Sequence, residues 1–152
     1  MADHARRGAG DRFGLRRFVD AQEDGGIYRR ALGEMRAGRK QGHWIWFVFP
    51  QIAGLGQSAM SRAYAIGTLA EARAYLEHPL LGPRLEECCE ALLSTDPSLT
   101  ADQILGPVDA IKVRSSMTLF HRADPARKLF ESVLSRFYAN VPDPATDRLL
   151  LL

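Results

Sequence analysis

Residues 107–122 read PVDAIKVRSSMTLFHR, and this stretch decides the fold class. Pro107 suits the first turn of a helix, which we expect to run to about His121. At 100° per residue its apolar side chains fall into two sectors: Val113, Met117 and Phe120 in one, and Val108 and Leu119 in the other. A helix that is apolar on several sides lies inside a protein rather than on its surface. The segment therefore predicts a fold in which this helix is packed by others.

The rest of the chain also favours helices over sheets. Leu and Ala together supply 39 residues, against 17 for Val, Ile and Thr. Helix starts are indicated at Asp11, Thr68, Thr100, Asp124 and Asp143, the last two followed by proline, and stops at Gly38, Gly106 and Asn140. We also predict a mobile tail at residues 1–10. A single compact all-α domain of about seven or eight short helices, without a substantial sheet, should follow at residues 11–152.

Composition excludes several classes of function. The 152 residues fit one domain, and 20 basic against 18 acidic residues give a net charge of +2. That charge is too small to attract nucleic acid or a membrane surface in bulk, so the sequence disfavours both as partners. The adjacent Cys88 and Cys89 make a disulfide framework impossible, which favours the cytoplasm. The four histidines lack neighbours at metal-ligand spacing, so we expect neither a metal nor a cofactor.

Both tryptophans lie in residues 43–51, HWIWFVFPQ. The run shows no alternation and has no partner strand, so we expect a short buried helix or turn that ends near Pro50. Two interpretations stay open. The block could be core, with the indole N–H groups bonded to local acceptors. Alternatively, Trp44 or Trp46 could form a stacking wall for a planar ligand, with His43 at the lip as acid, base or hydrogen-bond donor.

Lys112, Ser115 and Ser116 fall within an arc of about 100° on the 107–122 helix. Serine hydroxyls in such a place can bond back to the preceding turn, which is the purely structural alternative. An unpaired buried ammonium costs several kcal/mol, so Lys112 must reach water, pair with a carboxylate such as Asp109, or serve a site. With Ser116 one turn on, Lys112 could hold a phosphate or a carboxylate.

These two segments together predict a ligand pocket. An indole would stack a base-like or other planar group, while the cations and hydroxyls would hold an anionic part, as in a nucleotide. His43 is the candidate for a catalytic proton transfer. The predicted ligand-binding residues are Arg39, Lys40, His43, Trp44, Trp46, Gln51, Lys112, Ser115 and Ser116. The sequence leaves open whether the protein is an enzyme.

Three blocks also carry a family resemblance: RKQGHWIWFVFPQIAGLGQS at 39–58, EARAYLEHPLLGPRL at 71–85 and KVRSSMTLF at 112–120. In this order they resemble the bacterial domain of unknown function 1810 family, over roughly residues 11–150. Members of that family are often labelled calpastatin, but calpastatin is a disordered inhibitor with repeated motifs, and this chain has no repeat. The resemblance implies a small, mainly helical intracellular domain and transfers no catalytic role.

A different class of function remains open. The protein could be an interaction module or a homo-oligomer without catalytic activity, in which the aromatic block is core. The terminal leucines at 149–152 would then dock against a partner chain or a second copy.

Overall fold

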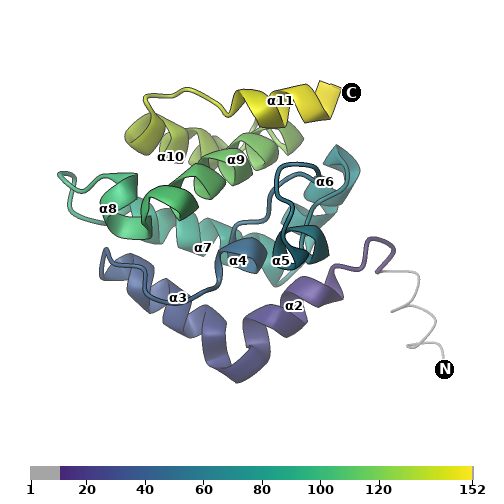
Figure 1. Cartoon of the computed structure of the whole chain (residues 1–152), viewed down its shortest axis with the longest axis horizontal. Helices are drawn as coiled ribbons and strands as arrows, with labels where there is room; N and C mark the ends of the chain where they lie inside the picture. Colours follow the sequence, from purple (N-terminus) through teal and green to yellow (C-terminus); the bar gives the residue numbers. More distant parts are fainter. Residues whose placement is uncertain (1–10, 152) are drawn as a thin grey trace.

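The computed structural model describes residues 11–151, and helix α9 (Pro107–Ala123) runs through the middle of the fold. Figure 1 shows α9 crossing the molecule between the first helices and the last ones. Its packing partners are α4 (Ile45–Val48), α6 (Leu69–Glu77), α8 (Ala101–Leu105), α10 (Lys128–Tyr138) and α11 (Pro144–Leu151). Nine residues of α9 are buried, among them Val113, Met117 and Phe120. The expected central position of this helix is explained by its apolar residues on several sides.

The remaining helices close the core around α9. A short 3₁₀ turn, η1 (Asp24–Gly26), joins two helices that form the V at the lower edge of Figure 1. Of these two helices, α2 (Arg16–Glu23) packs on α4 and α3 (Ile27–Arg36) packs on α7 (Leu81–Leu93). The remaining helices also include α5 (Ala59–Ala63).

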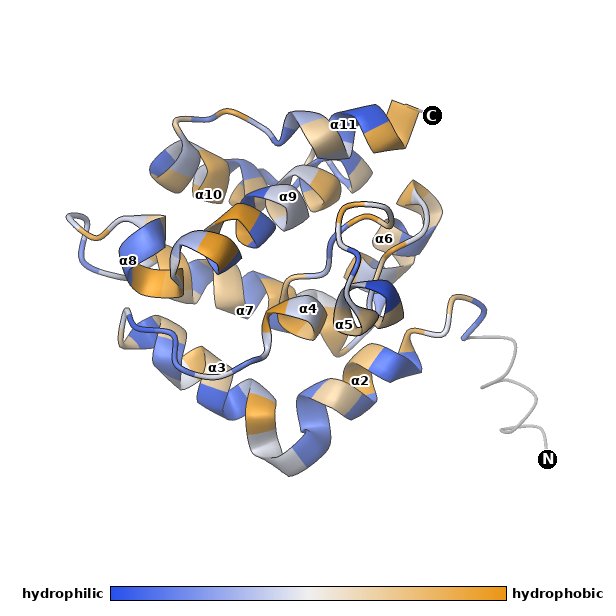
Figure 2. Ribbon diagram, in the orientation of Figure 1, coloured by the Kyte–Doolittle hydropathy of each residue, from blue (hydrophilic) through white to orange (hydrophobic). Residues whose placement is uncertain are grey.

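The all-α prediction is confirmed. Between residues 11 and 151 the backbone forms helices and loops without a sheet, and a single parallel bridge joins Ile52 to Ile66. Figure 2 shows hydrophobic and hydrophilic residues interleaved along most helices, and most of the large apolar side chains in the described range are buried. The tail predicted at residues 1–10 lies outside the described residues. No helix in the described range is both long enough and apolar enough to cross a bilayer.

Some predicted helix ends are confirmed. Thr100 and Gln103 form a complete capping box at α8. Thr68 Oγ1 accepts the Glu71 N–H at 3.1 Å, but Glu71 bonds back to Gly67 N rather than to Thr68, so only half of the second predicted box forms. The expected stop at the end of α10 takes the left-handed conformation at Asn140, with φ 57°.

Two predicted helix starts are wrong. Helix α2 begins at Arg16 rather than at residue 12, because Gly14 has a φ of 67° and residues 11–14 form a turn. Helix α10 begins at Lys128 rather than at residue 125. There Asp124 and Arg127 close a turn through a backbone hydrogen bond of 3.1 Å and a side-chain ion pair of 2.9 Å. Asp124 therefore holds a turn instead of capping the helix.

Candidate ligand-binding cleft

Trp44 belongs to the core. Its side chain is fully buried, and its indole N–H donates to Glu34 Oε1 at 2.8 Å. The same carboxylate oxygen accepts the backbone N–H groups of Gln41 and Gly42 at 2.8 and 2.9 Å. Burial alone would raise the pKa of Glu34, but these hydrogen bonds lower it below its usual range. Glu34 thus fixes the loop that carries Trp44, as the core interpretation of the aromatic block predicts.

Lys40 holds this loop against α9. Its ammonium lies 2.8 Å from Asp109 Oδ2, lies 4.8 Å from the centre of the Trp44 ring, and donates to the carbonyl of Gly42. The side chain is only 8 % exposed. Because its ammonium is nearly buried and already has an ion pair and a hydrogen bond, Lys40 is a structural residue.

Lys112 lies on the other side of Asp109. Its ammonium is 3.4 Å from Asp109 Oδ1 and 5.0 Å from the centre of the Trp46 ring, and the side chain is 23 % exposed. The pairing with Asp109 was one of the three predicted roles and is confirmed. Because this contact is long and an ammonium has three protons, Lys112 keeps donors for a further acceptor.

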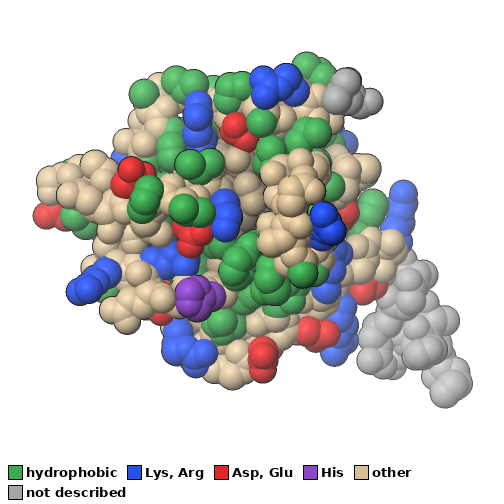
Figure 3. Space-filling view, viewed as in Figure 1, with side chains coloured by type: hydrophobic (Ala, Val, Ile, Leu, Met, Phe, Trp, Pro, Cys, Tyr) green, Lys and Arg blue, Asp and Glu red, His purple; other side chains and the backbone are tan. Residues whose placement is uncertain are grey.

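Lys112 also lines a cleft of about 320 Å³ between α9, the loop after α4 and the start of α11. We call it the Lys112 cleft. Figure 3 shows this face of the molecule, where hydrophobic and basic side chains gather over α9 and α4. The residues that line the Lys112 cleft are Gln51, Leu55, Gly56, Ser61, Val108, Ile111, Lys112, Ser115, Asp143 and Ala145. Four of these ten are apolar side chains and supply most of the exposed lining surface, and the cleft also holds one ammonium, of Lys112, and one carboxylate, of Asp143.

Asp143 lines the cleft immediately before the first residue of α11. Its Oδ2 accepts hydrogen bonds from Ser115 and Thr146 at 2.7 and 2.6 Å, and its Oδ1 accepts the Ala145 N–H at 3.3 Å. Burial favours a raised pKa, yet these donors hold the pKa of Asp143 below the usual value. The carboxylate is therefore charged at neutral pH and caps the first turn of α11, as the Asp143–Pro144 pair predicts.

The structure brings only part of the predicted set together. Three of them, Gln51, Lys112 and Ser115, line the cleft. Trp46 is not in the lining, but its ring contacts the ammonium of Lys112. Ser116 is fully buried, and its hydroxyl has no hydrogen-bond partner among the residues that the structure describes. Arg39, Lys40, His43 and Trp44 do not line the cleft, and Arg39 and His43 are exposed.

Several lining residues were not predicted from the sequence. Val108 and Ile111 follow the spacing i, i+3, i+4, i+7 with Lys112 and Ser115, so one stripe of α9 faces the cleft. That spacing was visible in the sequence and could have identified Ile111. Leu55, Ser61 and Asp143 come from three other segments, and no pattern in the chain signals that they meet.

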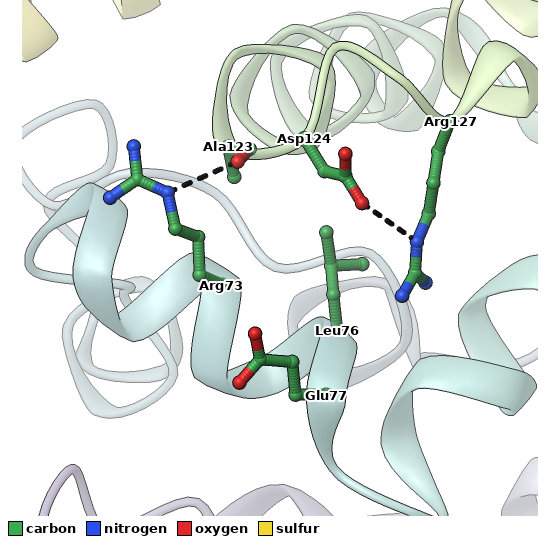
Figure 4. A pocket seen from close by; sticks show the side chains of 6 residues that line it. All are labelled: Arg73, Leu76, Glu77, Ala123, Asp124 and Arg127. Carbon is green, nitrogen blue, oxygen red and sulfur yellow. Dashed lines mark hydrogen bonds and ion pairs between the residues drawn. The ribbon is translucent and has the colours of Figure 1, made fainter.

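A second pocket, of about 260 Å³, lies between α6 and the turn before α10 (Figure 4). Its charged groups largely satisfy one another. Arg73 Nε donates to the carbonyl of Ala123 at 3.2 Å, and Arg127 pairs with Asp124 at 2.9 Å and with Glu86 at 3.1 Å. The Lys112 cleft is the better candidate, because there an ammonium with spare donors meets apolar walls. Within residues 11–151 no group of three or more His, Cys, Asp or Glu side chains could hold a metal ion.

Comparison with known proteins agrees with this fold. A family model described as a protein of unknown function (DUF1810) matches residues 12–150. The crystal structure of the conserved hypothetical protein Rv1873 from Mycobacterium tuberculosis superposes with a TM-score of 0.88 at 47 % sequence identity, covering 92 % of this chain and 98 % of that one. No curated protein matches. The family match spans most of the sequence and confirms the predicted resemblance, so the chain belongs to the DUF1810 family of proteins of unknown function.

Proposed function

We propose that the protein binds a small molecule with an anionic group and a planar or otherwise apolar body in the Lys112 cleft. The observation that carries this proposal is the position of Lys112, whose ammonium lines a cleft of about 320 Å³ and retains donors beyond its long contact with Asp109. An ammonium beside apolar walls attracts an anion more strongly than one in water, because the local dielectric is lower.

The neighbours of Lys112 support the same role. Lys40 lies closer to the Asp109 carboxylate than Lys112 does, at 2.8 Å from Oδ2 against 3.4 Å from Oδ1. Lys40 thereby neutralises much of the carboxylate that would otherwise compete with a ligand for Lys112. The amide of Gln51 and the hydroxyl of Ser61 add polar groups that can orient a ligand.

A thermal-shift screen against nucleotides, sugar phosphates and small carboxylates tests this function. A ligand at a hundredfold excess over its dissociation constant should stabilise the fold by about 2.7 kcal/mol. The Lys112→Met variant keeps the aliphatic stem and should lose that stabilisation. Lys128→Met removes an exposed lysine of α10 and serves as the matched control, with stabilisation unchanged. Equal stabilisation of Lys112→Met and the unaltered protein would contradict the proposal.

The interaction-module alternative has one specific observation in its favour. Val108 and Ile111 on α9 are 65 % and 66 % exposed, and Leu151 is 86 % exposed. Leu149 and Leu150, by contrast, pack against the core, so only part of the predicted leucine terminus is available. A monomer–dimer equilibrium that Ile111→Ser shifts toward monomer, measured by analytical ultracentrifugation, would favour this alternative.

The proposed setting is a reducing compartment such as the cytoplasm. Cys88 and Cys89 are both free and buried, and burial raises the pKa of the Cys88 thiol to about 12. These cysteines are therefore unreactive core residues.

A further inference from the structure

The lining of the Lys112 cleft carries one cationic and one anionic side chain. Lys112 and Asp143 both line the cleft, and behind Lys112 the carboxylate of Asp109 is matched by Lys40. No arginine lines the cleft among the described residues. A bound anion can therefore draw on one ammonium, and a second negative charge on it would find no further cation in the lining.

Asp143 makes a second negative charge actively unfavourable. Its three hydrogen bonds, from Ser115, Thr146 and Ala145, hold the carboxylate in place in the lining of the cleft. Like charges repel, and the repulsion grows with the product of the two charges. In this cleft a dianion would meet the Asp143 carboxylate with two negative charges and a monoanion with only one.

The features that usually bind phosphate are also absent from this lining. The amide of Ala145 in the first turn of α11 is already used by Asp143. The Gly54–Ser58 loop leads into α5, which has only five residues, and Ser58 Oγ caps that helix by accepting Ser61 N–H at 3.1 Å. Neither helix start is open to an anion in the way that phosphate-binding helices require.

The walls of the cleft indicate what the rest of the ligand is like. Leu55, Val108, Ile111 and Ala145 supply hydrocarbon, and two of them are about two-thirds exposed. Figure 2 shows hydrophobic residues in the first turns of α9, where Val108 and Ile111 lie. An apolar body lying there would remove that surface from water, which favours binding. The volume is at the lower end of the range for ligand pockets, about 300–1,000 Å³, and so suits a small body.

We infer, building on the proposed function, that the ligand is a small monocarboxylic acid. Its carboxylate pairs with Lys112, and its apolar body covers Val108 and Ile111. Phosphate esters, including nucleotides, are selected against by Asp143.

Four probes test this inference by titration followed by two-dimensional NMR at pH 8. Phenylacetate and hexanoate are monoanions with apolar bodies. Phenyl phosphate has a similar shape to phenylacetate but is a dianion at this pH, since its second pKa is about 6. Phenylacetamide is the uncharged analogue. We expect both monocarboxylates to shift resonances of cleft residues and to bind at least tenfold more tightly than the phosphate or the amide.

Two variants and a control locate the site. Lys112→Met should abolish phenylacetate binding, and Ile111→Ser should weaken it severalfold. Leu151→Ser, which changes an exposed leucine outside the cleft, should leave it unchanged.

The outcomes separate this inference from the proposed function. Tighter binding of phenyl phosphate at the cleft would overturn the monocarboxylate assignment and leave anion binding intact. Equal binding of phenylacetamide would overturn both, because the ammonium would then have no role. No shift with either monocarboxylate would overturn the inference, and the wider anion screen would still decide the proposed function.

Discussion

Replacing Lys40 with methionine should destabilise the fold far more than the same change at Lys112, although both lysines contact the same carboxylate. Lys40 is 8 % exposed, lies 2.8 Å from Asp109 and also donates to the carbonyl of Gly42. Lys112 is 23 % exposed and lies 3.4 Å from Asp109. Comparing the two variants therefore distinguishes a lysine that holds the fold together from a lysine that lines the candidate cleft.

The magnitudes follow from these contacts. Each charge-assisted hydrogen bond of Lys40 contributes about 1.5–3 kcal/mol, and its position over the Trp44 ring adds about 0.5–2 kcal/mol. Because methionine keeps most of the stem and Asp109 keeps Lys112, we expect a net loss of about 3 kcal/mol. The exposed and longer contacts of Lys112 predict a loss of about 1 kcal/mol or less.

Urea unfolding of the two variants, followed by circular dichroism, gives both free energies. The larger loss corresponds to a fall in melting temperature of roughly 6–12 °C for a chain of this length. Lys128→Met again supplies the control, with a change within about 0.5 kcal/mol because its side chain is exposed. A loss at Lys112→Met that equals or exceeds the loss at Lys40→Met would refute this assignment of roles.

Three further predictions concern single sites outside the lining of the Lys112 cleft. Gly82→Ala should destabilise the fold by at least about 2 kcal/mol in urea unfolding, because an added Cβ would lie 2.1 Å from the carbonyl oxygen of Leu76; unchanged stability would show that α6 and α7 can separate freely. Ser116→Ala should stabilise the fold by up to about 1 kcal/mol, since it removes a buried hydroxyl without a partner, and a clear loss would reveal a hydrogen bond that the structure lacks. The folded state lowers the pKa of Glu34, so the stabilising contribution of this carboxylate is full above its unfolded-state pKa of about 4.3 and is lost as the pH falls through the lower folded-state value. The Glu34→Gln variant should therefore lose less unfolding free energy between neutral and acidic pH than the unaltered protein. An equal loss in both proteins would contradict the role of this carboxylate.

The parts of the fold that the sequence predicted are those set by local chemistry. Thr100 bonds to Gln103 three residues later, and Asn140 ends α10 through its own left-handed backbone conformation, so their roles could be read from the chain. The start of α10 was predicted wrongly because Asp124 pairs with Arg127 instead, and several nearby partners compete for one carboxylate. Local patterns could not decide that competition.

The candidate site was predicted less completely than the fold. Three predicted residues, Lys112, Ser115 and Gln51, line the cleft. Lys112 and Ser115 could be predicted because a cation and a hydroxyl group on one arc of a helix can be recognised from the sequence. Trp44 was the less suitable of the two indoles, and only its partner Glu34, ten residues earlier, shows why. Asp143 reaches the cleft from 28 residues beyond Ser115, and a single sequence does not report such proximity.

Because Asp143 caps α11 and also lines the Lys112 cleft, the stability of this helix depends on what binds in the cleft. Asp143 and Ala145 form both the first turn of that helix and one wall of the Lys112 cleft. Ligand occupancy should therefore slow amide exchange in α11. Because the coupling is reciprocal, any event that detaches α11 should weaken ligand binding by the same factor, so that amide exchange in this helix reports whether the cleft is filled.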